Sequence, residues 1–235
     1  MANLGMITEK YDRLVLFDTE TTGLQFQRDE IIEFSAVVID IANGTARISQ
    51  EYDNLVALTP GNRIPEMITQ LTGITNEDVA ARGISKEQLC RDIAEMVTEN
   101  TLLLAYNAHF DLSFLFYLLL RNGDPTILKG KDKLDLLTVY KDRRPYPHKL
   151  CNAIDAYGLS GKVVNSHRAI DDVLATVAVM EAMVAEQDDL ECYVNLFGYN
   201  PKYGIDGKPI GSVTYKPQPY RNQNQQFITP LYATL

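Results

Sequence analysis

The sequence predicts an α/β fold with a mixed sheet flanked by helices. Residues 14–17 form a continuous apolar run, which is typical of a strand buried on both faces. Two more strand-like segments, 31–40 and about 46–57, follow after short connections, as antiparallel neighbours do. Three helical segments between about 64 and 98 then precede another apolar run at 101–105, so we expect this later strand to add to the sheet in parallel.

The rest of the chain, to about residue 196, is predicted to be mostly helical. One helix follows Asn107 and ends at Asn122-Gly123, because Asn and Gly favour helix ends. A loop at 165–167 precedes another apolar helix from about 169 to about 184. No internal repeat is present in the sequence.

The composition changes beyond about Tyr199, where the chain becomes rich in Pro, Gly, Tyr, Asn and Gln. We therefore divide it into a globular domain, residues 1–198, and an extension, residues 199–235, in which we expect a small hairpin and an extended tail. The extension carries several aromatic side chains, so packing against a second copy of this chain, as a homodimer, or against a protein partner is one expectation. A disordered tail is the other.

The composition predicts a soluble, cytoplasmic protein. The chain has 235 residues, 46% of them hydrophobic, enough for a full core, but no apolar run of membrane-spanning length. The first residues lack the apolar core of a signal peptide, and the three cysteines fit a reducing compartment. No phosphate-binding loop, dinucleotide-binding or nucleophile-elbow motif is found.

The net charge of −9 argues at first against a nucleic-acid partner. Residues 1–200 carry 18 basic and 30 acidic side chains, whereas residues 201–235 carry four basic and one acidic. Acidic residues that hold cations would reverse the local field. The candidate phosphate contacts are Arg143, Arg144, Lys149 and Arg168.

Acidic residues that could form a site occur in three segments of the chain. Asp18 and Glu20 follow the first apolar run, and residues two apart in a strand point to the same side, so both carboxylates should project together from the strand end while Thr19 faces away. Asp111 falls in the first turn of a helix, where the helix dipole favours negative charge. Asp171 and Asp172 both fall in the early turns of the last helix, just after His167, and hydrophobic spacing does not separate the two.

Crowded carboxylates repel one another, so cations are expected to hold them. Such a cluster is typical of a two-metal phosphodiester site, in which hard Mg²⁺ or Mn²⁺ ions prefer carboxylate and water ligands. A neutral histidine next to the cluster can accept the proton of an attacking water.

Between about Leu14 and Met183 the sequence resembles the DEDDh family of 3′→5′ exonucleases, which includes the proofreading epsilon subunit of bacterial DNA polymerase III. The resemblance rests on LVLFDTETTGL, YNAHFDLSFL and SHRAIDDVLAT, and on the intervening IIEFSAVVI, IPEMITQLTGIT and HKLCNAIDAYGL. Tyr106 departs from the family, which usually has histidine there. The resemblance implies a ribonuclease H-like fold and selects Asp172 over Asp171 by the family spacing.

The resemblance also implies a role for each site residue. The metal ligands for two Mg²⁺ or Mn²⁺ ions are Asp18, Glu20, Asp111 and Asp172, and His167 is the general base. The residues that bind the substrate, a single-stranded or frayed 3′ end, are Thr22, Gly23, Leu24, Asn107 and Phe110. The expected products are nucleoside 5′-monophosphates. By analogy with family members, the resemblance also implies a polymerase or repair partner for the C-terminal extension.

Two other functions stay open from the sequence. An exoribonuclease would use the same catalytic residues. No residue in the sequence shows how the site would treat the 2′-hydroxyl of RNA. A non-catalytic binding module on the same fold would lack a ligand, and none is missing. Each site residue also has an ordinary structural reading, and for Glu33 and Asp135 hydrogen-bonding and capping roles are at least as consistent with the sequence as catalytic ones.

Overall fold

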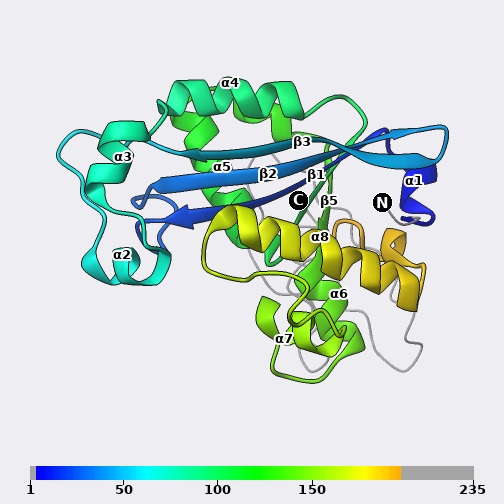
Figure 1. The fold of residues 1–235 in the computed structure, drawn as a ribbon. Coiled ribbons are helices and arrows are strands. Elements are labelled where there is room, and N and C mark those ends of the chain that lie inside the picture. The colour runs from blue at the N-terminus through cyan, green and yellow to red at the C-terminus, as the bar shows by residue number, and fades with distance from the viewer. Residues whose placement is uncertain (1–3, 197–235) are drawn as a thin grey trace.

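The protein, seen in a computed structural model that describes residues 4–196, is built on a five-stranded sheet with the order β3-β2-β1-β4-β5. Figure 1 shows β1 at the centre of this sheet. The strands are β1 (Arg13–Thr21), β2 (Ile31–Ala42), β3 (Thr45–Leu55), β4 (Thr101–Ala105) and β5 (Asp132–Asp135). The pairs β1–β2 and β2–β3 are antiparallel, whereas β1–β4 and β4–β5 are parallel. The predicted mixed sheet is confirmed.

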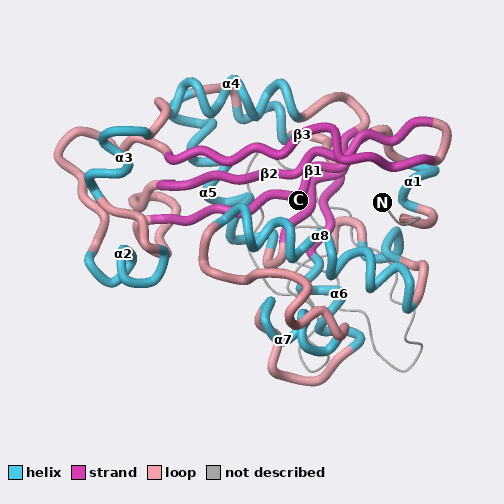
Figure 2. Tube along the Cα trace, in the orientation of Figure 1, coloured by secondary structure: helices cyan, strands magenta, loops and turns pink. Residues whose placement is uncertain are grey.

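Helices cover both faces of the sheet, as Figures 1 and 2 show. Helix α4 lies on one side, packed against α5, and α8 crosses the other side over β1 and β2, with α6 and α7 below it. The helices are α1 (Ile7–Lys10), α2 (Glu66–Thr72), α3 (Asn76–Arg82), α4 (Lys86–Met96), α5 (Ala108–Asn122), α6 (Leu136–Arg143), α7 (Leu150–Ala156) and α8 (Ala169–Glu186), with 3₁₀ turns η1 (Pro125–Leu128) and η2 (Leu190–Tyr193).

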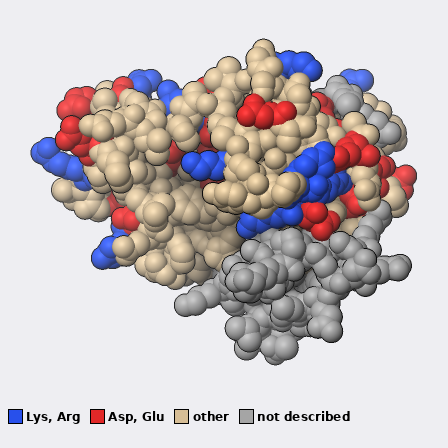
Figure 3. Space-filling view, turned by 90° about the horizontal axis from the view of Figure 1, so that it is seen from below, with Lys and Arg blue, Asp and Glu red and all other residues tan. Residues whose placement is uncertain are grey.

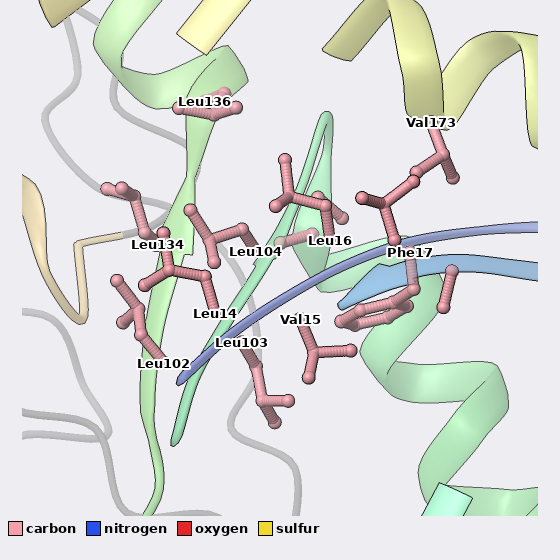
Figure 4. Close-up of a cluster of buried hydrophobic side chains, with 14 of the residues drawn as sticks. Leu14, Val15, Leu16, Phe17, Leu102, Leu103, Leu104, Leu134, Leu136 and Val173 are labelled. Carbon is pink, nitrogen blue, oxygen red and sulfur yellow. The ribbon is translucent and has the colours of Figure 1, made fainter. Parts of the chain in front are cut away.

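The core explains why the first apolar run lacks alternation. In parallel register, Val15 lies next to Leu103 and Leu16 next to Leu104. Figure 4 shows Leu16 and Leu104 on the side of β1 that faces Val173 of α8, and Val15 and Leu103 on the opposite side. Each of these strand residues is at most 2% exposed, because helices cover both faces.

Two details of the predicted strands are wrong. The apolar run predicts a first strand over residues 14–18, but β1 continues to Thr21, because its backbone pairing with β2 does not depend on apolar side chains. We also expected mostly helix and no further strand assignment after residue 105, but residues 132–135 form β5 beside β4. The segment Asp-Lys-Leu-Asp has too few apolar residues to predict a strand, and its burial comes from its neighbours.

The expectations for the C-terminal extension concern residues 199–235. The predicted hairpin and tail, and the boundary at residue 198, lie outside the described residues. None of the helices between residues 4 and 196 is long and apolar enough to span a bilayer.

Candidate active site

The candidate site lies where β1 loses its parallel neighbour. Strand β4 pairs with β1 only as far as Leu16, whereas β2 accompanies β1 to its end. After Ala105 the chain leaves β4 and enters α5, so the β4-facing edge of β1 beyond Leu16 is free to receive side chains. This divergence of two strands at the sheet centre is the usual place for a site in an α/β sheet.

Three carboxylates meet beside this edge. Oxygen atoms of Asp18, Glu20 and Asp172 all lie within 4.8 Å of one another. Asp18 and Glu20 project from the same side of β1, toward α8, as their spacing predicts. Asp172 comes from the first turn of α8, where the helix dipole stabilises a negative charge. Asp171, one residue earlier, is not part of this group within the described chain.

Asp111 approaches the edge of β1 that β4 leaves free. Its Oδ1 accepts hydrogen bonds from the Thr19 amide at 3.0 Å and the Thr19 hydroxyl at 2.7 Å, and its side chain is buried. The Thr19 side chain therefore does face away from its two acidic neighbours, as predicted, and there it positions Asp111. The sequence analysis did not predict this role of Thr19. The alternation of side chains along β1 does place the Thr19 side chain away from Asp18 and Glu20, which is the pattern that could have indicated it.

The electrostatics of the cluster favour a bound cation. Burial, and then the charge of Asp111, raises the pKa of Asp18 well above its usual range. Burial, with the charges of Asp172 and Glu33, raises the pKa of Glu20 to about 8. Burial raises the pKa of Asp111 to about 7 despite the Thr19 hydrogen bonds, and it also raises the pKa of Asp172. Hard oxygen donors whose ionised forms repel one another fit Mg²⁺ or Mn²⁺.

The raised pKa values predict how the metal-free protein responds to pH. Because the folded-state pKa values of Glu20 and Asp111 lie above their unfolded values, the folded state holds more protons between about pH 4 and 8, and its stability falls as pH rises through this range. We expect the melting temperature in chelator to drop by roughly 5 °C from pH 5 to 8.

The same reasoning predicts that a divalent ion restores stability at high pH. Mn²⁺ at about 100 times its Kd should stabilise the protein by about 2.7 kcal/mol, or about 5–10 °C at pH 8, and by less at pH 5, where protons compete. Thermal denaturation across pH with chelator, Mg²⁺ and Mn²⁺ tests this. A melting temperature at pH 8 that does not respond to either ion would contradict a cation site.

Buried Glu33 fixes the start of α8, the helix that carries Asp172. Glu33 lies directly opposite Glu20 on β2 and is fully buried. Its carboxylate accepts hydrogen bonds from Arg168 Nε at 2.9 Å and from the Ala169 amide at 2.9 Å, and forms a salt bridge with the Arg168 guanidinium. It thus satisfies an otherwise unpaired amide of the first turn of α8. Glu33 has the hydrogen-bonding role that the sequence allowed.

Buried Asp135 does the same for α5, the helix that carries Asp111. Its Oδ1 accepts from the amides of Asn107 and Ala108 at 2.9 and 3.1 Å, and also from Leu137 at the start of α6. The predicted capping role of Asp135 is confirmed at α6, and it extends to α5, 27 residues away along the chain. Both helices that carry a candidate metal ligand therefore begin at a buried carboxylate of the sheet.

The residues just before these two helices share an uncommon backbone conformation. Asn107 has a φ of 75° and His167 a φ of 58°, the left-handed region that Asn and His adopt more readily than most residues. His167 is exposed at the loop edge, as expected. Left-handed residues of this kind often mark functional positions.

The loop before α8 contributes contacts that the sequence did not reveal. The Asn165 side-chain amide donates to Asp172 Oδ1 at 2.7 Å, which orients that carboxylate. Asp171 instead accepts from the Ser166 hydroxyl and points away from the cluster. Nothing in the sequence distinguished Asn165 from an ordinary loop residue.

The predicted substrate-binding residues line the end of β1 and the start of α5. Thr22 is tied to Glu30 by two hydrogen bonds of 2.9 Å. A Cβ atom at Gly23 would lie 2.4 Å from the Asp29 carboxylate, so a larger residue there would displace that side chain. Leu24 is 79% exposed, whereas Phe110 is half-buried, 5.0 Å from the Phe114 ring. Leu24 is therefore the apolar side chain of this set that is open to a ligand.

Three of the four expected phosphate contacts have carboxylate partners. Arg143 pairs with Asp189 and donates to the Met183 carbonyl at the end of α8, Arg144 pairs with Glu186, and Arg168 pairs with Glu33. Lys149 is exposed. Figure 3 shows Lys and Arg side chains of one face in separate groups, several beside acidic ones. Each of these three arginines is therefore already paired with a carboxylate of the fold.

Comparison with known families and relatives agrees with this geometry. The family model described as Exonuclease, RNase_T, matches residues 15–180. DNA polymerase III subunit epsilon of Treponema pallidum is 30% identical over 173 residues, 72% of this chain and 75% of that protein. A PolC-type DNA polymerase III of Caldanaerobacter subterraneus is 31% identical over 75% of this chain, which spans only 12% of the polymerase.

Solved structures share the fold. E. coli exonuclease I in complex with a dT13 oligonucleotide superposes with a TM-score of 0.67 at 22% identity, over 75% of this chain and 42% of that chain. The predicted ribonuclease H-like architecture is thus confirmed. Since the family model covers most of the chain and the Treponema relative aligns over most of both proteins, this chain belongs to the RNase_T exonuclease family.

Proposed function

We propose that this protein is a metal-dependent 3′→5′ exonuclease that releases nucleoside 5′-monophosphates from DNA 3′ ends. The observation that carries the proposal is the group of three carboxylates, from β1 and α8, within 4.8 Å of one another. Two relatives support the direction and the substrate: one is named 3′-5′ exonuclease DinG, 37% identical over 47% of this chain, and exonuclease I was solved with DNA oligonucleotides.

In this proposal each acidic residue is a metal ligand. Asp18, Glu20, Asp111 and Asp172 hold two divalent ions, Mg²⁺ or Mn²⁺. The ions would stabilise the charge that develops on the attacking and leaving oxygens of an in-line displacement. Thr19, Asn165, Glu33 and Asp135 keep the ligands in place through the hydrogen bonds described above, so that little reorganisation is needed when substrate binds.

His167 is the proposed general base. It lies on an exposed loop five residues before Asp172, so its imidazole can turn toward the cluster from the solvent side. A neutral imidazole there takes the proton from the attacking water and passes it to solvent. Leu24 and Phe110 contact the terminal base, while Thr22, Gly23 and Asn107 contact its sugar and phosphate.

A site that places one terminal phosphodiester against the cluster accepts a single strand, so a paired end must first unpair, at a cost of a few kcal/mol per base. We therefore expect single-stranded and frayed 3′ ends to be degraded faster than paired ends. The test is digestion of 5′-labelled single-stranded DNA, duplex DNA and RNA in parallel, with Mg²⁺ or Mn²⁺.

The expected result is a ladder shortened from the 3′ end, with 5′-mononucleotides as the product. A circular single strand is the matched control and should survive. Cleavage of the circle would contradict an exonuclease, and preferential digestion of the RNA would replace DNA with RNA as the substrate.

A further inference from the structure

Two arginines, Arg28 and Arg63, line a pocket near the end of β1. This pocket of about 310 Å³ opens between the β1–β2 connection and the segment before α2. Thr22 and Arg28 line it from one side, and Asn62 and Arg63 from the other. Thr22 is two residues beyond Glu20, so the pocket lies within about 7 Å, along the chain, of a metal-site carboxylate.

The acidic residues of this pocket already have partners. Glu30 forms a salt bridge with Lys86 at 2.7 Å and accepts from the Thr59 amide at 2.9 Å, contacts that lower its pKa. Asp29 accepts from the Gln25 amide at 2.7 Å. The charge of Lys86 thus offsets the negative charge of Glu30. The contacts of Glu30 and Asp29 also fix the positions of the segments that line the pocket.

The two arginines, in contrast, have no partner among residues 4–196. Both side chains are exposed, and neither guanidinium forms an ion pair or hydrogen bond with a described residue. Arg143, Arg144 and Arg168, which the sequence suggested as phosphate contacts, are paired with carboxylates. A protein with a net charge of −9 needs unpaired cations where a nucleic-acid strand passes.

We propose that Arg28 and Arg63 bind a backbone phosphate of the substrate strand. The proposal rests on the proposed function: an enzyme that removes one nucleotide from a 3′ end has the rest of the strand on the 5′ side of the scissile bond. Two guanidinium groups from opposite walls match a phosphate, which accepts several charge-assisted hydrogen bonds. Thr22 lines the pocket and lies two residues beyond Glu20 along the chain, which brings the pocket near the carboxylate cluster.

The test compares the double variant R28Q/R63Q with R47Q. Arg47 is an exposed arginine on β3, in the register of Asp40 and Arg13, at the opposite end of the sheet from Glu20. Arg13 and Glu20 are seven residues apart on β1, or about 23 Å. R47Q therefore removes the same kind of charge from a distant place and should behave as wild type.

Two substrates separate binding of the strand from the chemistry. One is a single-stranded DNA of about 12 nucleotides, within the usual range of a binding groove. The other is the p-nitrophenyl ester of thymidine 5′-monophosphate, which has one phosphate and no strand. For R28Q/R63Q we expect kcat/KM to fall about tenfold more for the strand than for the ester, chiefly through KM.

Salt dependence gives an independent readout. The slope of log Kd for the strand against log salt should decrease by about 0.7 for each phosphate that the variant no longer neutralises. An unchanged slope and KM, or an equal loss on both substrates, would overturn the subsite. A wild-type protein that hydrolyses neither substrate, but binds the strand with an arginine-dependent slope, would keep the subsite and reject the nuclease.

Discussion

Asp172→Asn is expected to lower kcat by on the order of 10³-fold or more, whereas Asp171→Asn retains most of the activity. The substitution keeps the shape of the side chain and removes one charge from the carboxylate cluster. Loss of a metal ligand removes several kcal/mol of transition-state stabilisation, and each 1.36 kcal/mol corresponds to a tenfold change in rate.

The neighbouring aspartate is a matched control. Both residues lie in the first turn of α8, but Asp171 bonds to Ser166 and Asp172 lies with Asp18 and Glu20. An asparagine at 171 still has an oxygen to accept from the Ser166 hydroxyl. Single-turnover rates of both variants on a labelled strand, with Mn²⁺ titrated, provide the measurement. Equal activity of the two variants, or a larger loss in Asp171→Asn than in Asp172→Asn, would contradict the choice of Asp172 as the metal ligand.

The stability of the Asp172→Asn protein is part of the same prediction. Without metal, the ionised carboxylates repel one another, so neutralising one should leave the melting temperature in chelator unchanged or raise it, most clearly at pH 8. The variant should lose most of the stabilisation that Mn²⁺ gives the wild type. A marked loss of stability in chelator would mean that Asp172 is primarily a structural residue.

His167→Ala is expected to lower kcat by about 10²- to 10⁴-fold, the range for a positioned general base, while Mn²⁺ binding is largely retained. The wild-type rate should fall toward acid pH, because a protonated imidazole cannot accept a proton, and the variant should lose that limb of the profile. Mn²⁺ titration calorimetry and pH profiles of both proteins test this.

The left-handed backbone at His167 calls for a second variant. Alanine at a φ of 58° is strained by about 1–2 kcal/mol, so a loss of activity in His167→Ala could come from the loop and not from the imidazole. Glycine adopts this conformation freely. His167→Gly should therefore be as inactive as His167→Ala. Recovered activity in the glycine variant would assign His167 a backbone role only.

Local patterns in the sequence determined much of this protein. The unbroken run Leu-Val-Leu-Phe at 14–17 required a strand covered on both faces, and the two-residue spacing of Asp18 and Glu20 put their carboxylates on one side. Asp111 and Asp172 each follow a loop into an apolar helix, which placed both in first turns. These properties follow from residues a few positions apart, and periodicity reports them directly.

The choice between Asp171 and Asp172 as the site residue did not follow from local sequence. Both Asp171 and Asp172 suit the start of a helix, and family resemblance alone favoured Asp172 in the sequence. In the structure, the turn of about 100° between consecutive helical residues directs Asp171 to Ser166 and Asp172 to β1. The decisive neighbour, β1, lies about 150 residues earlier in the chain.

Only the tertiary structure decided which charges stabilise the fold and which are open to a ligand. Arg168 looked like a phosphate contact, but its partner Glu33 is 135 residues away, and Arg143 meets Asp189 across 46 residues. The short strand β5 likewise gains its burial and hydrogen bonds from β4. A buried charge must be paired wherever the fold brings a partner, and that partner is set by packing between distant segments, which no local pattern encodes.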